Sequence, residues 1–213
     1  MKKNYLLVML IAMCFTADVW AEGGWKLLYE SEGVTVSSRE VPGSNFDEFK
    51  VEGTIYASIE AIGGALLDIG RYPQWVPDCI ETSVIERTGN YDMVLYYALT
   101  TPFPLKQRDV VLKLFTTMNN AEGEVVSEFE SFACDKRPVR NDRVRITLMR
   151  GKWVLKRIAP METHAMFVSW ADPGGNVPSV IVNSTRKKNP FKTFTGLRDL
   201  VLNHRYAKSA GAH

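Results

Sequence analysis

Apolar and polar side chains alternate along most of the chain, which is typical of β-strands that bury one face. Two strand-like segments come first, at 25–40 and 46–55, around a Pro-Gly-Ser-Asn turn. Short turns separate the later segments and favour antiparallel neighbours over strands linked by helices. These later segments lie at 82–87, 93–100, 110–118, 124–132, 143–149, 152–158 and 163–170, and one predicted turn is Arg150-Gly151.

A helical pattern interrupts the strands after residue 57. Ser58 suits the N-cap, Glu60 suits the first turn, and apolar residues recur at helical spacing as far as Ile69. Gly63-Gly64 weakens such a helix by about 1 kcal/mol per glycine relative to alanine, which indicates close packing or a bend. Prolines at 73 and 77 then disfavour further turns.

A second helical pattern follows the Asp-Pro-Gly-Gly turn at 172–175. From residue 177 to residue 201, positions three and four apart form one face of a long helix, which Pro190 is predicted to kink. A curved antiparallel sheet wrapped around this C-terminal helix would bury its apolar face. The predicted fold class is therefore α+β.

Composition and the N-terminus place the chain among exported globular proteins. With 213 residues, 46% hydrophobic content and a net charge of +2, the sequence is too apolar for disorder and too weakly charged to coat nucleic acid. Lys2 and Lys3 precede an uncharged run at 5–15, and Val19 and Ala21 fit a cleavage site. Residues 1–21 are thus predicted to be a signal peptide, which makes the protein periplasmic or secreted.

Charge is divided unevenly between the two halves of the chain. Residues 22–92 carry 13 acidic and 5 basic side chains, a net of −8, whereas residues 93–213 carry 10 acidic and 19 basic ones, a net of +9. The segment 136–157 holds nine basic residues and a single acid, Asp142. Two explanations stay open: the halves pack together or expose wet strand faces, or this surface makes transient contact with anionic membrane lipid.

Little in the sequence indicates catalysis. No nucleophile elbow, zinc-protease motif or phosphate-binding loop is present, and neither residue adjacent to His164 is acidic. Cys79 and Cys134 lack metal-site spacing. They also lie three predicted strand steps apart, about 14 Å, which favours unbridged thiols over a disulfide. We expect no cofactor and no metal.

Several phrases, in order, resemble the START lipid-transfer domain, a helix-grip fold related to the birch-allergen and polyketide-cyclase superfamily. They are EGV at 32–34, YPQW at 72–75, KQRD at 106–109, VRI at 144–146, GKW at 151–153 and DPGGNVP at 172–178. The resemblance covers about residues 25–205, so we expect one domain at 22–208 and a tail at 209–213.

The resemblance implies a curved sheet around a long C-terminal helix, with an apolar tunnel that holds one lipid-like molecule and the helix as part of a lid. The expected function is non-covalent binding and transfer of a lipid or other hydrophobic ligand in the cell envelope, by a monomer with no nucleic-acid partner. Two alternatives remain: an enzyme of the cyclase-like superfamily that acts on a hydrophobic substrate, or a structural envelope protein.

The candidate ligand-binding residues come from the ends of strands and from the long helix. Arg108-Asp109 either reaches a lipid headgroup at the tunnel mouth or forms an ion pair at the strand entry. Arg145 either faces water or is a buried cation paired with an acid such as Glu128 or Glu130. The full set of candidates is Trp75, Tyr96, Arg108, Asp109, Arg145, Trp170, Ile181, Ser184, Phe191, Phe194 and Leu197.

Overall fold

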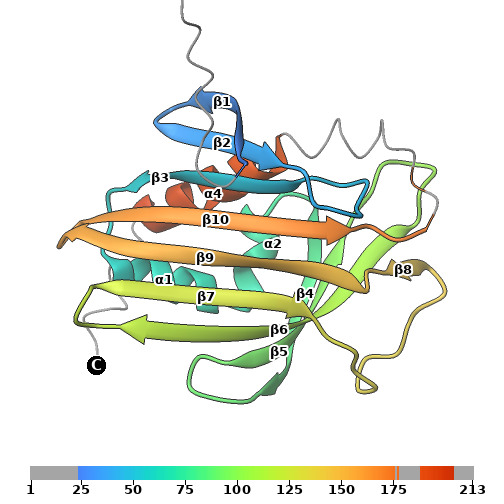
Figure 1. The fold of residues 1–213 in the computed structure, drawn as a ribbon. Helices are drawn as coiled ribbons and strands as arrows, with labels where there is room; N and C mark the ends of the chain where they lie inside the picture. The colour runs from blue at the N-terminus through green and yellow to red at the C-terminus, as the bar shows by residue number, and fades with distance from the viewer. Residues whose placement is uncertain (1–23, 176, 178–187, 204–213) are drawn as a thin grey trace, which may run out of the picture.

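The computed structural model describes residues 24–175, 177 and 188–203 (Figure 1). The predicted signal peptide therefore lies outside the described residues. The strands are β1 (Lys26–Ser31), β2 (Val34–Arg39), β3 (Glu48–Ile55), β4 (Cys79–Arg87), β5 (Met93–Leu99), β6 (Gln107–Asn119), β7 (Glu124–Ser131), β8 (Arg143–Arg145), β9 (Leu148–Ala159) and β10 (Glu162–Asp172). The helices are α1 (Ile59–Leu67), the 3-10 turn η1 (Ile69–Arg71), α2 (Tyr72–Trp75) and α4 (Asn189–Leu202).

One curved sheet of ten strands runs in the order β1-β2-β3-β10-β9-β7-β6-β5-β4, and β8 pairs beside β6. The neighbours along this path are antiparallel, whereas the short β8 is parallel to β6. The helices lie against one face of the sheet, called the inner face from here on; Figure 1 looks onto the opposite, outer face. The predicted α+β helix-grip fold is confirmed.

Helix α1 begins as the sequence predicts. The Ser58 side chain accepts a hydrogen bond from the amide of Ala61 at 3.2 Å, which caps the first turn. Ile59, Ile62 and Leu66 are buried against the sheet. A Cβ added at Gly63 or Gly64 would meet no heavy atom within 4 Å, so close packing within the protein does not explain this glycine pair.

The C-terminal helix differs from its prediction at Pro190. In the structure α4 begins at Asn189, and Pro190 occupies its first turn, where the missing amide breaks no helical hydrogen bond. Pro190 therefore does not kink the middle of this helix. The earlier part of the predicted helix, at 178–187, lies outside the described residues. No helix among the described residues is long and apolar enough to cross a membrane.

Helix α4 packs closely against the core through one face and against α2 at Gly196. Phe194 and Leu197 have no exposed surface, and they share one apolar cluster with β2, β3 and α1. Gly196 lies so close to α2 that an added Cβ would be 2.3 Å from the carbonyl oxygen of Trp75. A side chain here would push the two helices apart, so glycine is required at this contact.

The predicted strand at 143–149 is divided between two strands in the structure. Arg143–Arg145 forms the parallel strand β8, and β9 then runs without interruption from Leu148 to Ala159. The predicted turn at Arg150-Gly151 therefore lies inside β9. A Cβ at Gly151 would be 2.3 Å from the carbonyl oxygen of Val168 and 2.5 Å from the Phe129 ring. This glycine marks a close approach of a side chain to the backbone rather than a turn.

Ion pairs between the halves account for much of the charge asymmetry. Basic residues of the 136–157 segment bind acidic residues from the first half, which supports the first of the two explanations given for that segment. The pairs are Lys136–Glu86, Arg137–Glu81, Arg143–Glu81, Arg150–Glu48 and Arg157–Glu60.

Cys79 and Cys134 are free thiols, as predicted. Cys79 opens β4 on the inner face, whereas Cys134 follows β7 and packs on the outer face. Strands β5 and β6 separate them in the sheet.

Candidate ligand-binding site

A cavity of about 80 Å³, called the inner cavity below, lies between the inner face of the sheet and the helices. Strands β5, β6, β7, β9 and β10 form one wall, and α1, α2 and α4 form the other. Its described lining is neutral and mostly apolar: Leu66, Tyr72, Trp75, Val76, Leu95, Tyr97, Leu112, Leu114, Ser127, Phe129, Met149, Trp153, Phe167 and Thr193. Such a surface suits an alkyl or aromatic ligand.

Most polar atoms of this lining have partners inside the protein. The Tyr72 hydroxyl donates to the carbonyl of Leu66 at 2.6 Å, and the hydroxyls of Ser127 and Thr116 share a hydrogen bond of 2.7 Å. Burial raises the pKa of Tyr97 well above its ordinary value, so this phenol stays neutral. The buried indole nitrogen of Trp75 is different, because no acceptor among the described residues reaches it.

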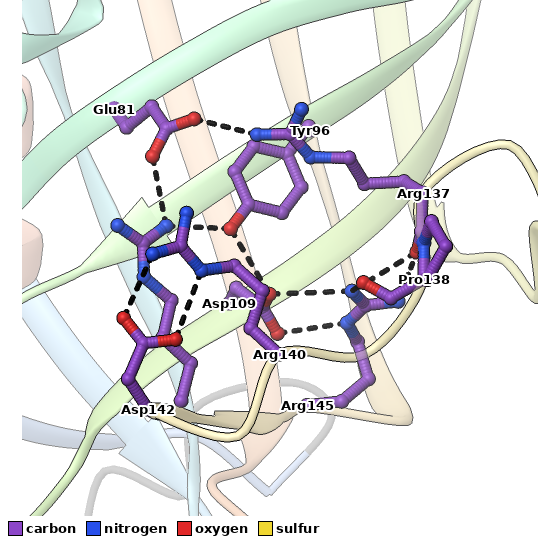
Figure 2. A network of polar contacts seen from close by, with 9 residues as sticks. Glu81, Tyr96, Asp109, Arg137, Pro138, Arg140, Asp142 and Arg145 are labelled. Carbon is purple, nitrogen blue, oxygen red and sulfur yellow. Dashed lines mark hydrogen bonds and ion pairs between the residues drawn. The ribbon is translucent and has the colours of Figure 1, made fainter.

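Three of the predicted site residues come together on the outer face, away from the inner cavity (Figure 2). The Tyr96 hydroxyl donates to Asp109 at 3.0 Å, and Arg145 donates to both carboxylate oxygens of Asp109 at 2.7 and 3.2 Å. Asp109 and Tyr96 have no exposed surface. Burial and the hydrogen bond to Asp109 raise the pKa of Tyr96. This Tyr96–Asp109–Arg145 group is called the outer network below.

The loop between β7 and β8 covers the outer network. Arg145 also donates to the carbonyls of Arg137 and Pro138 at 3.2 and 3.3 Å, and the Arg137 guanidinium lies 3.9 Å from the centre of the Tyr96 ring. The Arg145 side chain is thus largely buried, at 14% exposed, and its partner is Asp109 rather than Glu128 or Glu130. Its donors are engaged within the protein, which is the arrangement of a structural clamp.

Arg108 and Asp109 are not paired with each other, because adjacent strand residues point to opposite faces. Arg108 is 4% exposed and donates to the carbonyls of Lys106 at 2.5 Å and of Pro173 and Gly174 at 3.5 Å. Desolvation lowers its pKa. Arg108 therefore fastens the loop after β10 to the start of β6.

Trp170 also lies on the outer face. Its indole nitrogen donates to the carbonyl of Phe46 at 3.0 Å, and the Arg150 guanidinium stacks 4.7 Å from the ring centre. Trp170 is three residues after the inward-facing Phe167, so the strand alternation turns it away from the inner cavity.

The remaining predicted site residues divide between cavity, core and undescribed segments. Trp75 lines the inner cavity. Phe191 packs against Tyr29 with ring centres 5.8 Å apart, and Phe194 and Leu197 belong to the solid core beside the cavity. Thr193 is the α4 residue that lines the cavity. Ile181 and Ser184 lie outside the described residues.

The sequence did contain a signal for the lining residues that were missed. Side chains on one face of a strand are two residues apart in sequence. This spacing relates several lining residues that were missed: Leu95 to Tyr97, Leu112 to Leu114, and Trp153 to the other inward positions of its strand. The alternation groups these residues on one face, but it does not say which face the helices cover.

Comparison with known proteins places the fold in a family. The START domain family matches residues 19–205. The chain is 28% identical to an uncharacterized protein of Pseudomonas aeruginosa over 82% of this chain and 85% of that protein. It is 28% identical to mouse START domain-containing protein 10 over 80% of this chain and 59% of that relative.

A solved structure agrees with this assignment. A STAR-related lipid transfer protein fragment from Xanthomonas axonopodis superposes with a TM-score of 0.76 at 29% identity, and the match covers 84% of this chain and 98% of that one. The family match spans the sheet and all the described helices. The chain therefore belongs to the START domain family, which is known for binding and transferring lipids.

Proposed function

We propose that this protein binds a lipid or similarly hydrophobic molecule non-covalently in the inner cavity and carries it through the cell envelope. The observation that carries the proposal is the cavity lining, which is mostly apolar and includes Trp75, whose buried indole N–H has no acceptor among the described residues. An unsatisfied buried donor costs about 1–3 kcal/mol, and an oxygen of a bound ligand would remove that cost.

The chemistry of the lining favours a carrier over an enzyme. General acid–base catalysis needs a group that gains or loses a proton near neutral pH. The described residues that line the inner cavity include no carboxylate, imidazole or thiol, and the burial of Tyr97 holds its phenol in the neutral form. Binding and release are therefore the functions that these side chains support.

The envelope location is supported by the sequence pattern of residues 1–21. N-terminal sequencing of the mature protein should begin at Glu22. Recovery of intact residues 1–21 on a membrane-embedded protein would contradict this part of the proposal.

The ligand must open the structure as it enters. About 80 Å³ is well below the 300–1,000 Å³ of ordinary small-molecule sites. An apolar ligand gains about 0.8 kcal/mol for each buried CH₂, which favours an expanded, occupied state over the closed one. Each strand in the sheet wall of the cavity is hydrogen-bonded to a neighbour on both sides, so this wall resists opening. We therefore expect the wall formed by the helices to move.

Native mass spectrometry of protein purified from its own envelope tests the proposal directly. We expect a bound lipid that is released on denaturation. In the variant Leu112→Trp an indole would fill the cavity and the lipid should be lost, whereas Lys113→Trp, one residue along on the outer face, should retain it. Protein that carries no ligand, or equal loading of the two variants, would contradict the proposal.

A further inference from the structure

A second hollow lies beside the inner cavity, between α1 and the strands β6 and β7. Its volume is about 300 Å³, and we call it the α1 groove. Its lining combines apolar side chains, three glycines and polar residues, among them Glu60 of α1 and Arg157 of β9, which form an ion pair. The lining is Ile59, Glu60, Gly63, Gly64, Leu66, Leu67, Tyr91, Thr116, Met118, Asn120, Gly123, Glu124, Val125, Ser127 and Arg157.

The α1 groove and the inner cavity share a wall. Leu66 and Ser127 line both spaces, one from the helix and one from the sheet. The Ser127 hydroxyl is already paired with Thr116, so the wall between the two spaces presents no free hydroxyl there. The inner cavity has the volume of about three liquid waters, whereas the groove alone reaches the lower end of ordinary ligand sites. A long ligand therefore needs both.

Gly63 and Gly64 keep the groove wide but lower the stability of helix α1. Each glycine destabilises a helix interior by about 1 kcal/mol relative to alanine. Gly151 and Gly196 are required because a Cβ would collide with a neighbour, but a Cβ at Gly63 or Gly64 would enter open space. What the glycine pair preserves is the width of the groove.

The polar end of the ligand is indicated by Trp75. Its indole nitrogen is a neutral donor, and the described lining of the inner cavity contains no cation. A carboxylate or phosphate buried there would lose its hydration without gaining a counter-charge, which is strongly unfavourable. A neutral carbonyl oxygen can accept from Trp75 at no such cost.

We propose that the α1 groove holds the alkyl chain of a neutral single-chain acyl ester whose carbonyl accepts a hydrogen bond from Trp75 in the inner cavity. The chain passes between Leu66 and Ser127 and runs along Gly63 and Gly64 towards the Glu60–Arg157 ion pair. This inference rests on the proposed function and specifies its ligand and the path of that ligand through the protein.

The proposed position of the alkyl chain is tested by placing a larger side chain in the α1 groove. Monopalmitoylglycerol and its eight-carbon analogue, monooctanoylglycerol, are titrated against the full mature protein and followed by tryptophan fluorescence. In Gly64→Leu, affinity for the sixteen-carbon ester should fall about tenfold or more, while affinity for the short ester changes less than about twofold. Gly70→Leu is the matched control, because it adds the same side chain at an open position outside the groove. It should bind both esters as the wild type does.

The carbonyl anchor is tested by Trp75→Phe, which keeps a ring in the cavity wall and removes the donor. Affinity for both esters should fall about tenfold, and palmitate should bind the wild type more weakly than monopalmitoylglycerol does. Gly64→Ala keeps the groove passable, so normal binding in this variant shows that a defect in Gly64→Leu comes from obstruction rather than from misfolding.

The outcomes separate this inference from the proposed function. If Gly64→Leu and Gly70→Leu bind the long ester equally, the groove does not hold the chain, while the proposed function stands. If the wild type binds palmitate more tightly than the ester, the neutral class is wrong. If the protein binds neither ester and carries no lipid from its own envelope, the proposed function fails as well.

Discussion

Two neighbouring tyrosines of β5 belong to different environments. Tyr97 lies on the inner face among Cys79, Leu95 and Leu112 and lines the inner cavity. Tyr96 lies on the outer face, where it donates to Asp109 and accepts from Arg143 at 2.5 Å. Both are buried. Burial therefore does not separate the ligand site from the scaffold here, whereas the charge of the surroundings does: the described lining of the inner cavity is neutral, and Tyr96 lies among charged, hydrogen-bonded side chains.

The largest effect is expected from breaking the outer network. Asp109→Ala leaves the largely buried Arg145 guanidinium without its carboxylate, and removing one partner of a buried pair costs about 3–5 kcal/mol. Urea unfolding should show this loss, while lipid binding by the remaining folded protein stays unchanged. Asp142→Ala is the control, since its pair with Arg140 is exposed and its loss should leave the unfolding midpoint in place. Full stability with lost lipid binding would instead place Asp109 in the ligand site.

A similar loss of stability is expected when a ring is removed from the packed core on the inner side, but not when the removed ring lines the cavity. Phe194→Ala removes a ring with no exposed surface from packed core, so unfolding should require about 3–5 kcal/mol less free energy. Phe129→Ala removes a ring that lines the cavity, so its stability loss should be smaller and its lipid retention poorer. If the two variants lose stability equally and retain lipid equally, the cavity does not differ from the core around it.

Alanine substitutions at two glycines should cause smaller stability changes, whose sign depends on whether an added methyl group meets open space or a neighbouring atom. Gly64→Ala adds a methyl group in open space and restores helix propensity, so α1 and the protein should gain about 1 kcal/mol. Gly196→Ala forces a methyl group against the Trp75 carbonyl and should destabilise the protein. Thermal unfolding measures both. Destabilisation by Gly64→Ala would mean that α1 is closely covered at this position.

The smallest effect concerns the two cysteines. Burial raises the pKa of Cys79 from 9.0 to about 11, so the folded state holds this proton more tightly than the unfolded chain does. The stability contributed by the protonated thiol is complete below pH 9 and is lost as the pH rises from about 9 to about 11. Alkylation at pH 8 should label the half-buried Cys134 and spare Cys79 until the protein unfolds. Equal labelling rates in the folded protein would contradict this.

Local patterns predicted most of the fold. Three features could be predicted because each depends on residues that are close in sequence. They are the Ser58 cap, the strand alternation and the helical face of Phe194, Leu197 and Val201. The glycine at 151 was misread as a turn, because its real cause is the Phe129 ring on the neighbouring strand. Only the strand order brings those two residues together.

The site was harder to predict than the fold, for the same reason. An uninterrupted apolar run, MVLYYAL at 93–99, is typical of a strand that is covered on both faces. What covers the outer face is the irregular loop after β7, which has no periodicity to read. Tyr96, Asp109 and Arg145 were therefore candidates for the ligand site, although their contacts place them beneath that loop.

The position of β10 between β3 and β9 also fixes the order in which the sheet can be completed. Val51 of β3 pairs with Phe167 of β10, so more than a hundred residues are made before this ladder can form. During synthesis the first three strands must wait with an unpaired edge, which is a state prone to aggregation. A chain that reached its compartment through a narrow pore, N-terminus first, would depend on a chaperone holding β3 until β10 arrived.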